Sequence, residues 1–135
     1  MANSLFAKFK ENLLNGDIAL DTNDIRVILV DTALYTVNLS THDFLDDIAA
    51  GARVAVSGAL TTKTTTLGVF DADDKTITAV TGATVEAVVL YVHTGVESTS
   101  YLIAYIDTGT GLPFTPNGGD VLVSWSSSAT RIFEV

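Results

Sequence analysis

The segment that most constrains the fold runs from Val85 to Asp107 and consists of two apolar stretches separated by a polar one. In the first, VEAVVLYVH, both sets of alternating residues are apolar, and only Glu86 marks a solvent-facing position. The second, YLIAYID, repeats this pattern, and the intervening TGVESTS is rich in residues that favour turns. We therefore predict a central β-hairpin that is covered on both faces, with four nearly inaccessible side chains: Val89, Leu90, Ile103 and Ile106.

Further strands are predicted on both sides of this hairpin. DIRVILVD, residues 24–31, is an apolar run of strand length, and RVAVSGAL, residues 53–60, alternates and is continued after a bend by TTKTTTLGVF. DADDK then turns the chain into TITAV, and DVLVSW and TRIFEV supply the last strands. Between the first two, Ser40 or Thr41 caps a helix of one to two turns through Asp43 and Asp47. This spacing predicts a mainly β fold, a single-domain antiparallel β-sandwich or partly closed barrel of about seven or eight strands with a short N-terminal helix.

Residues 1–16 are predicted to form that helix or arm, and residues 17–135 form the β-rich body of a single domain spanning 1–135. Asn3 or Ser4 caps the helix, and Asn15-Gly16 ends it. Because an apolar stripe normally faces its own core, packing on the sheet is favoured over docking of the arm on a neighbouring subunit. The stripe consists of Leu5, Phe6, Phe9 and Leu13.

Length and charge limit the classes of function. The 135 residues fit one domain, and the net charge of −9, from 16 acidic and 7 basic residues, opposes direct nucleic-acid binding. No apolar run approaches the ~20 residues that cross a bilayer, so we expect no membrane contact and synthesis in a cytoplasm. The acidic surface keeps such a protein soluble, or it faces a basic partner surface.

Residues that carry chemistry are sparse. The chain has two histidines, His42 and His93, and no cysteine, so we predict no enzyme activity. Asp71, Asp73 and Asp74 stand in a loop where alternate oxygens could hold calcium, but the full pattern of an EF-hand is missing, and aspartates in a β-turn explain the same residues. We predict no cofactor and no metal.

Three longer pieces carry a resemblance to a known family: DIRVILVDTALYTVNLSTHDFLDDI, SGALTTKTTTLGVFDADD and LIAYIDTGTGLPFTPNGGDVLVSW. In this order the chain resembles, over nearly its whole length, a family of small proteins encoded among the virion genes of tailed bacteriophages. The resemblance implies a structural protein located in the virion, either a head decoration (cement) protein or another head-associated protein. It implies the major capsid protein or other virion proteins as partners, and a homo-oligomeric or lattice-bound state.

Two other functions stay open at this point. One is a tail or baseplate component, and the other is a carbohydrate-binding module that uses aromatic rings such as Tyr91, Tyr105, Phe114 or Trp125. For assembly, the expected docking surface combines the N-terminal helix with the stiff loop from Thr108 to Asp120, where Phe114 lies between two prolines. Phe114 could instead fold back as a lid over the sandwich. The candidate partner interface comprises Leu5, Phe6, Phe9, Leu112 and Phe114.

Overall fold

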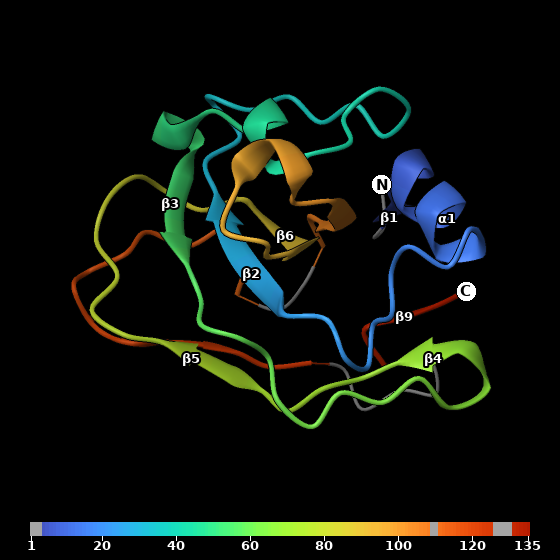
Figure 1. The fold of residues 1–135 in the computed structure, drawn as a ribbon. Helices are drawn as coiled ribbons and strands as arrows, with labels where there is room; N and C mark the ends of the chain where they lie inside the picture. Colours follow the sequence, from blue (N-terminus) through green and yellow to red (C-terminus); the bar gives the residue numbers. More distant parts are fainter. Residues whose placement is uncertain (1–3, 109–110, 126–130) are drawn as a thin grey trace.

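The computed structural model describes residues 4–108, 111–125 and 131–135 (Figure 1). Its centre is a five-stranded antiparallel sheet of order β1-β7-β6-β2-β3, and two further sheets have two strands each, β4-β9 and β5-β8. This mainly β, sandwich-like architecture confirms the predicted class, and the main sheet does not close into a barrel. The elements of the described residues are β1 (Ser4–Leu5), α1 (Ala7–Leu14), β2 (Ile25–Val30), β3 (Arg53–Val56), β4 (Val69–Phe70), β5 (Lys75–Ile77), β6 (Ala87–Val92), β7 (Leu102–Ile106), β8 (Val121–Val123) and β9 (Phe133–Glu134).

The predicted central hairpin is present. β6 and β7 pair antiparallel, with Val89 opposite Tyr105, and the register shifts after Leu90. β6 lies in the middle of the five strands and all six of its residues are buried. Val89, Leu90 and Ile103 are completely buried as predicted, whereas Ile106 is half-buried because it is the last residue of β7.

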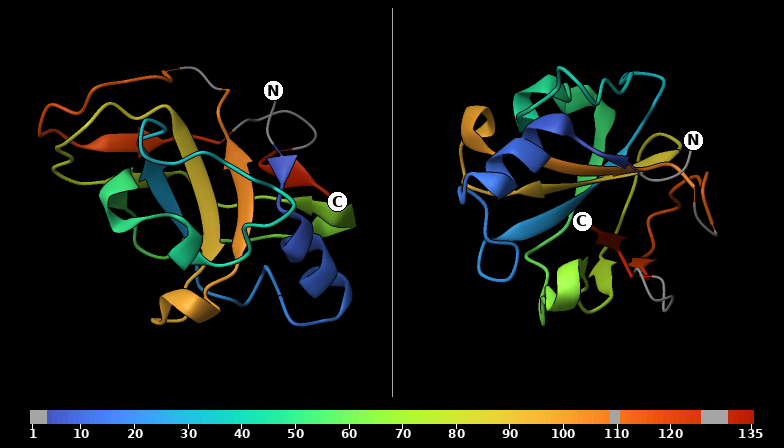
Figure 2. Two further views of the ribbon diagram at one scale, coloured as in Figure 1. Left: turned by 90° about the horizontal axis from the view of Figure 1, so that it is seen from above. Right: turned by 90° about the vertical axis from the view of Figure 1, so that its right-hand side faces the viewer.

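Two covering layers explain why both faces of the sheet are apolar. Figures 1 and 2 show the segment of residues 31–52 on one side of the sheet and the small sheets on the other. Completely buried side chains come from each layer: Ile48 from the 31–52 segment, Leu90 from β6 and Phe70 from β4. α1 adds Phe9, whose ring meets that of Phe133 edge to face at 5.7 Å between centroids.

The start of the helix differs from the prediction. Asn3 lies outside the described residues, and Ser4 does not cap the helix, because Ser4 and Leu5 form β1 and pair with Tyr105 and Ala104 of β7. The amide of Phe6 continues this ladder by donating to the Ile103 carbonyl at 3.0 Å. α1 has eight residues, and within the described part of the chain no helix has the length and apolar character that a membrane span requires.

The strand that is predicted to continue after a bend through TTKTTTLGVF is limited to the two residues of β4. After β3 the chain forms an isolated bridge between Thr64 and Asp71 and a short 3-10 helix, η3 (Thr66–Gly68), before the two residues of β4. The backbone of Thr62 and Leu67 has φ of 54°, a left-handed conformation that a continuous strand excludes. Threonine content alone does not reveal such a break.

The predicted helix at residues 43–47 is also shorter than expected. It consists of the 3-10 helix η1 (Leu45–Asp47), followed by η2 (Ala50–Ala52). Ser40 and Thr41 do not cap it; the Asp47 carboxylate accepts hydrogen bonds from the amides of Asp43 and Phe44 at 2.8 and 3.2 Å. This local competition from an acidic side chain closes a single turn rather than a longer helix.

Candidate functional site

The structure does not bring the five predicted interface residues together on an exposed surface. Phe6 and Phe9 are completely buried in the chain's own core, and Leu5 is half-buried in β1. Leu112 and Phe114 are half-buried and pack against the core. The main chain of Phe114 pairs with Val85 through two hydrogen bonds of 2.8 and 3.0 Å, so Phe114 folds back as the alternative lid would. In the folded chain, Phe6 and Phe9 are therefore not available at the surface.

The three aspartates of the possible calcium loop each engage a different protein partner. Asp73 accepts a hydrogen bond from the Thr62 hydroxyl at 2.7 Å, and Asp74 accepts one from the Trp125 amide at 2.9 Å. Asp71 lies 3.9 Å from the guanidinium of Arg131. In residues 4–108, 111–125 and 131–135, no group of three histidine, aspartate or glutamate side chains converges in a way that suits a metal ion.

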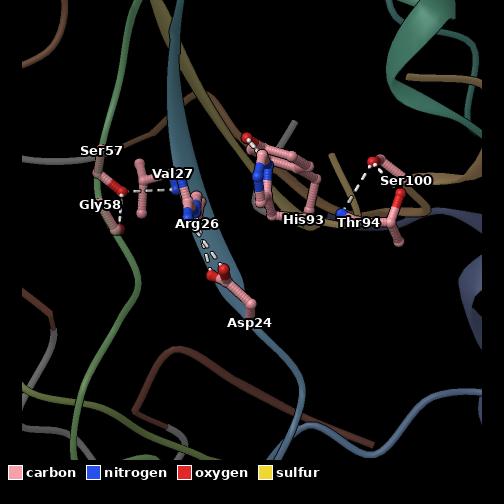
Figure 3. Close-up of polar contacts among 9 residues, drawn as sticks. Asp24, Arg26, Val27, Ser57, Gly58, His93, Thr94 and Ser100 are labelled. Carbon is pink, nitrogen blue, oxygen red and sulfur yellow. Dashed lines mark hydrogen bonds and ion pairs between the residues drawn. The ribbon is translucent and has the colours of Figure 1, made fainter. Parts of the chain in front are cut away.

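A polar network lies on β2, β6 and the ends of β3 and β7 (Figure 3). Arg26 binds the Asp24 carboxylate through two hydrogen bonds of 3.1 and 2.9 Å, and this contact lowers the pKa of Asp24 below its ordinary value. Across the strands, Arg26 is opposite Tyr91, whose hydroxyl lies 3.2 Å from Nδ1 of His93. The His93 amide in turn donates to the Asp24 carbonyl at 2.7 Å. These contacts tie the end of β6 to the start of β2.

The hydroxyl groups near this network form hydrogen bonds with main-chain groups. Ser57 Oγ accepts from the buried Val27 amide at 2.9 Å and donates to the Gly58 carbonyl at 2.7 Å. Ser100 Oγ donates to the Val96 carbonyl at 2.9 Å. A nucleophilic serine needs a base within hydrogen-bond reach, and neither hydroxyl is hydrogen-bonded to a histidine ring. The network has the character of structural bracing.

The aromatic rings considered for sugar binding do not form an exposed platform. Tyr91 and Tyr105 are buried in the main sheet, and burial raises the pKa of both phenols. Phe114 and Trp125 are half-buried, and the Trp125 indole donates to the Asp73 carbonyl at 3.1 Å. Carbohydrate recognition by stacking needs an open ring face, so this arrangement favours a structural role for the rings.

An open apolar groove lies between the end of α1 and the β4-β9 sheet, which Figures 1 and 2 show side by side. Its volume is about 330 Å³, at the low end of the ~300–1,000 Å³ of ligand pockets. Phe133 joins its two sides, because its ring contacts Phe9 and also lies 5.3 Å from the ring of Phe70. We call this feature the α1/β9 groove; its apolar lining comprises Leu13, Ile18, Leu20, Phe70, Phe133 and Val135.

Three large apolar side chains of the elements that form the α1/β9 groove are exposed to solvent. Leu67 is 95% exposed, Leu14 is 88% exposed and Val135 is 60% exposed. Of these three, only Val135 lines the groove, whereas Leu67 lines a second, shallower cavity together with Asp71 and Arg131. The sequence pattern does not reveal this region, because it places Leu67 in a strand and Val135 in the closing strand. The signal in the sequence is an isolated leucine between a polar run and a glycine.

Comparison with protein-family models and with curated proteins finds no match for this chain.

Proposed function

We propose that this chain is a non-enzymatic structural protein of a tailed-bacteriophage virion, and that it attaches to the head lattice as a decoration protein. The resemblance of its three long sequence pieces to small virion proteins supports this assignment. The observation in the structure that supports it is the open apolar α1/β9 groove with the exposed Val135 in its lining, because exposed apolar surface marks sites of protein-protein contact.

The electrostatics support a protein partner. A net charge of −9 repels the phosphates of packaged DNA, whereas the outer surface of a protein shell offers mixed charges. The partner in this proposal is the major capsid protein or another shell protein. Many copies on one lattice let individually weak contacts add up to firm attachment.

The experiment that tests this function is cryo-electron microscopy of virions produced from the genome that encodes the chain, combined with mass spectrometry of the purified particles. We expect density for the five-stranded sheet at regular positions on the head. Density confined to the tail would move the assignment to a tail or baseplate component. Absence of the chain from purified particles would contradict a virion role altogether.

A further inference from the structure

The chain contains two Asn-Gly sequences, Asn15-Gly16 and Asn117-Gly118. The amide nitrogen of the residue that follows an asparagine can attack the side-chain carboxamide, and glycine hinders this attack least because it has no Cβ. Both asparagines are exposed to solvent. The hydrogen bonds around the two sites differ, however, and this difference decides which site reacts.

Asn117 is held in place by the main chain around it. Its Oδ1 accepts a hydrogen bond from the Gly119 amide at 3.0 Å, which restrains the carboxamide. The nitrogen that would attack, that of Gly118, donates to the Val80 carbonyl at 2.8 Å. Both contacts have to break before a ring can close, and the loss of each one slows the reaction roughly two- to tenfold.

Asn15 has weaker restraints. It is the C-cap residue of α1, and its side chain has no hydrogen bond within residues 4–108, 111–125 and 131–135. The Gly16 amide donates to the Leu13 carbonyl at 3.2 Å, a long contact at a helix end, where the last turn frays. A Cβ built on Gly16 would meet no atom within 4 Å, so the turn has space for the backbone rotation that ring closure requires.

We propose that Asn15 is a site of spontaneous deamidation and that the fold protects Asn117 from the same reaction. The Gly16 nitrogen gives its proton to water or hydroxide and forms a bond to Cγ of Asn15. The bond between Cγ and Nδ2 then breaks, and Nδ2 leaves as ammonia after taking up a proton from solvent. The inference is independent of the proposed function.

Water completes the reaction by opening the cyclic imide at one of its two carbonyl carbons. Attack at Cγ gives aspartate, whereas attack at the main-chain carbonyl carbon gives isoaspartate, in which the main chain runs through Cβ and Cγ. In both cases the net change is an amide and a water molecule converted into a carboxylic acid and ammonia. No oxidant, metal or enzyme takes part.

The product alters the end of α1. Either form places a carboxylate at the C-terminus of the helix, where the dipole disfavours negative charge, and four residues after Glu11. The isoaspartate form also lengthens the main chain between α1 and Ile18, which lines the α1/β9 groove. We therefore expect faster hydrogen exchange in the last turn of α1 after deamidation, while β6 keeps its protection.

The first test follows the full chain by mass spectrometry during incubation in mildly alkaline buffer, both folded and unfolded in urea. Trypsin separates the sites, because Asn15 lies in the peptide of residues 11–26 and Asn117 is the only asparagine in the peptide of residues 76–131. Digestion at mildly acidic pH limits further reaction, and fragmentation distinguishes Asn15 from Asn12 and Asn23.

In the folded chain we expect Asn15 to react at least roughly tenfold faster than Asn117, with isoaspartate among its products. In urea the two rates should converge, because both sites then lose their hydrogen bonds. Equal rates in the folded chain, or a faster reaction at Asn117, would overturn the proposal. A rate ratio that persists unchanged in urea would show that the local sequence, and not the fold, protects Asn117.

The second test uses variants of the two asparagines. Asn15→Gln keeps a carboxamide but requires a larger ring, so deamidation of the peptide of residues 11–26 should fall at least roughly tenfold. The matched control, Asn117→Gln, should leave the rate at Asn15 unchanged. If the peptide of Asn15→Gln reacts at the parental rate, the modified residue is another asparagine and the proposal is wrong.

Hydrogen exchange tests the effect on the helix. Asn15→Asp reproduces the added charge without the longer main chain and should accelerate exchange in the last turn of α1, whereas Asn117→Asp should leave α1 unchanged. Equal protection of α1 in Asn15→Asp and the parent would contradict the proposed effect of the new carboxylate on the helix.

Discussion

The five-stranded sheet and the β5-β8 sheet are both antiparallel, but different interactions hold them. In β6 every side chain is buried, whereas in β8 Val121 and Val123 are half-buried and Leu122 points into solvent. The end of the small sheet is instead fastened by polar contacts, such as those that Asp74 accepts from Trp125 and Ser124. Burying one large apolar side chain contributes ~1.5–3 kcal/mol, and a typical hydrogen bond contributes ~0.5–1.5 kcal/mol. We infer that the main sheet determines global stability and that the small sheets open locally.

The largest expected effect comes from a cavity in the main sheet. Ile103→Ala removes a completely buried side chain of β7 and should lower the free energy of unfolding by ~2–5 kcal/mol, measured by chemical denaturation. The matched control is Leu122→Ala on β8, where we expect a change within about 0.5 kcal/mol. Similar losses for both variants would remove the distinction between the two sheets.

The second largest expected effect is a loss of folding stability at alkaline pH. Burial raises the pKa of Tyr35, Tyr91 and Tyr105 above the ordinary value of 10.0, so the folded state holds these protons more tightly than the unfolded state. Their contribution is fully present below pH 10.0 and is lost as the pH rises through the raised pKa values. Unfolding measured across this range should show a steep fall that Tyr91→Phe makes shallower. An identical pH dependence for this variant would refute the assignment.

A single buried hydrogen bond between β2 and the end of β3 gives a smaller effect. Ser57→Ala leaves the buried amide of Val27 without its acceptor and should cost ~1–3 kcal/mol. Ser98→Ala, at an exposed position, serves as the control in the same denaturation experiment. If Ser57→Ala behaves like Ser98→Ala, the amide has found another acceptor and the contact is not part of the bracing.

Loss of the polar contacts of Asp74 should loosen the β5-β8 sheet without affecting the main sheet. Asp74→Ala removes the acceptor for the Trp125 amide and the Ser124 hydroxyl, so hydrogen exchange should accelerate at residues 121–125. Amides of β6 should keep their protection, and Asp46→Ala should change neither region. Faster exchange throughout β6 would mean that the two sheets unfold as one unit.

Removal of calcium is expected to have no effect on the melting temperature. Because Asp71, Asp73 and Asp74 are each engaged with separate protein groups, removal of calcium by a chelator should leave the melting temperature unchanged. A large downward shift would show that these carboxylates bind an ion that stabilises the folded state. The same scan with added calcium provides the complementary measurement.

The comparison of the two regions also explains which parts of the fold are predictable from sequence. β2, β6 and β7 are predictable because their apolar runs have strand length and are rich in β-branched residues, as expected of strands that are buried on both faces. Residues 61–70 were assigned wrongly because β-propensity is averaged over a window, whereas the turn at Leu67 depends on a single backbone angle. The pairing of Ser4 with Tyr105 joins residues far apart in the sequence, and no local pattern encodes it.

The candidate site was less predictable than the fold. Phe6 and Phe9 were proposed for an interface because they are large and apolar, but the same property draws them into the core. The α1/β9 groove combines residues 13–21, 65–70 and 133–135, so its existence depends on tertiary packing. The exposure of Leu67 cannot be predicted from its sequence neighbours, because it depends on the direction in which the backbone turns its side chain.

The strand order of the main sheet sets the time course of its formation. β2 pairs with β6 about 60 residues later in the chain, and β1 pairs with β7 about 100 residues later. Loops of this length must close before any contact across them forms, so we expect refolding in the range of ~1 ms to seconds rather than microseconds. On the ribosome, β2 meets β3 first, but its other edge has to wait for β6, and β1 has to wait for β7. Until then Phe6, Phe9 and the apolar run of β2 remain incompletely covered, and this interval is the period in which the nascent chain is most prone to aggregation.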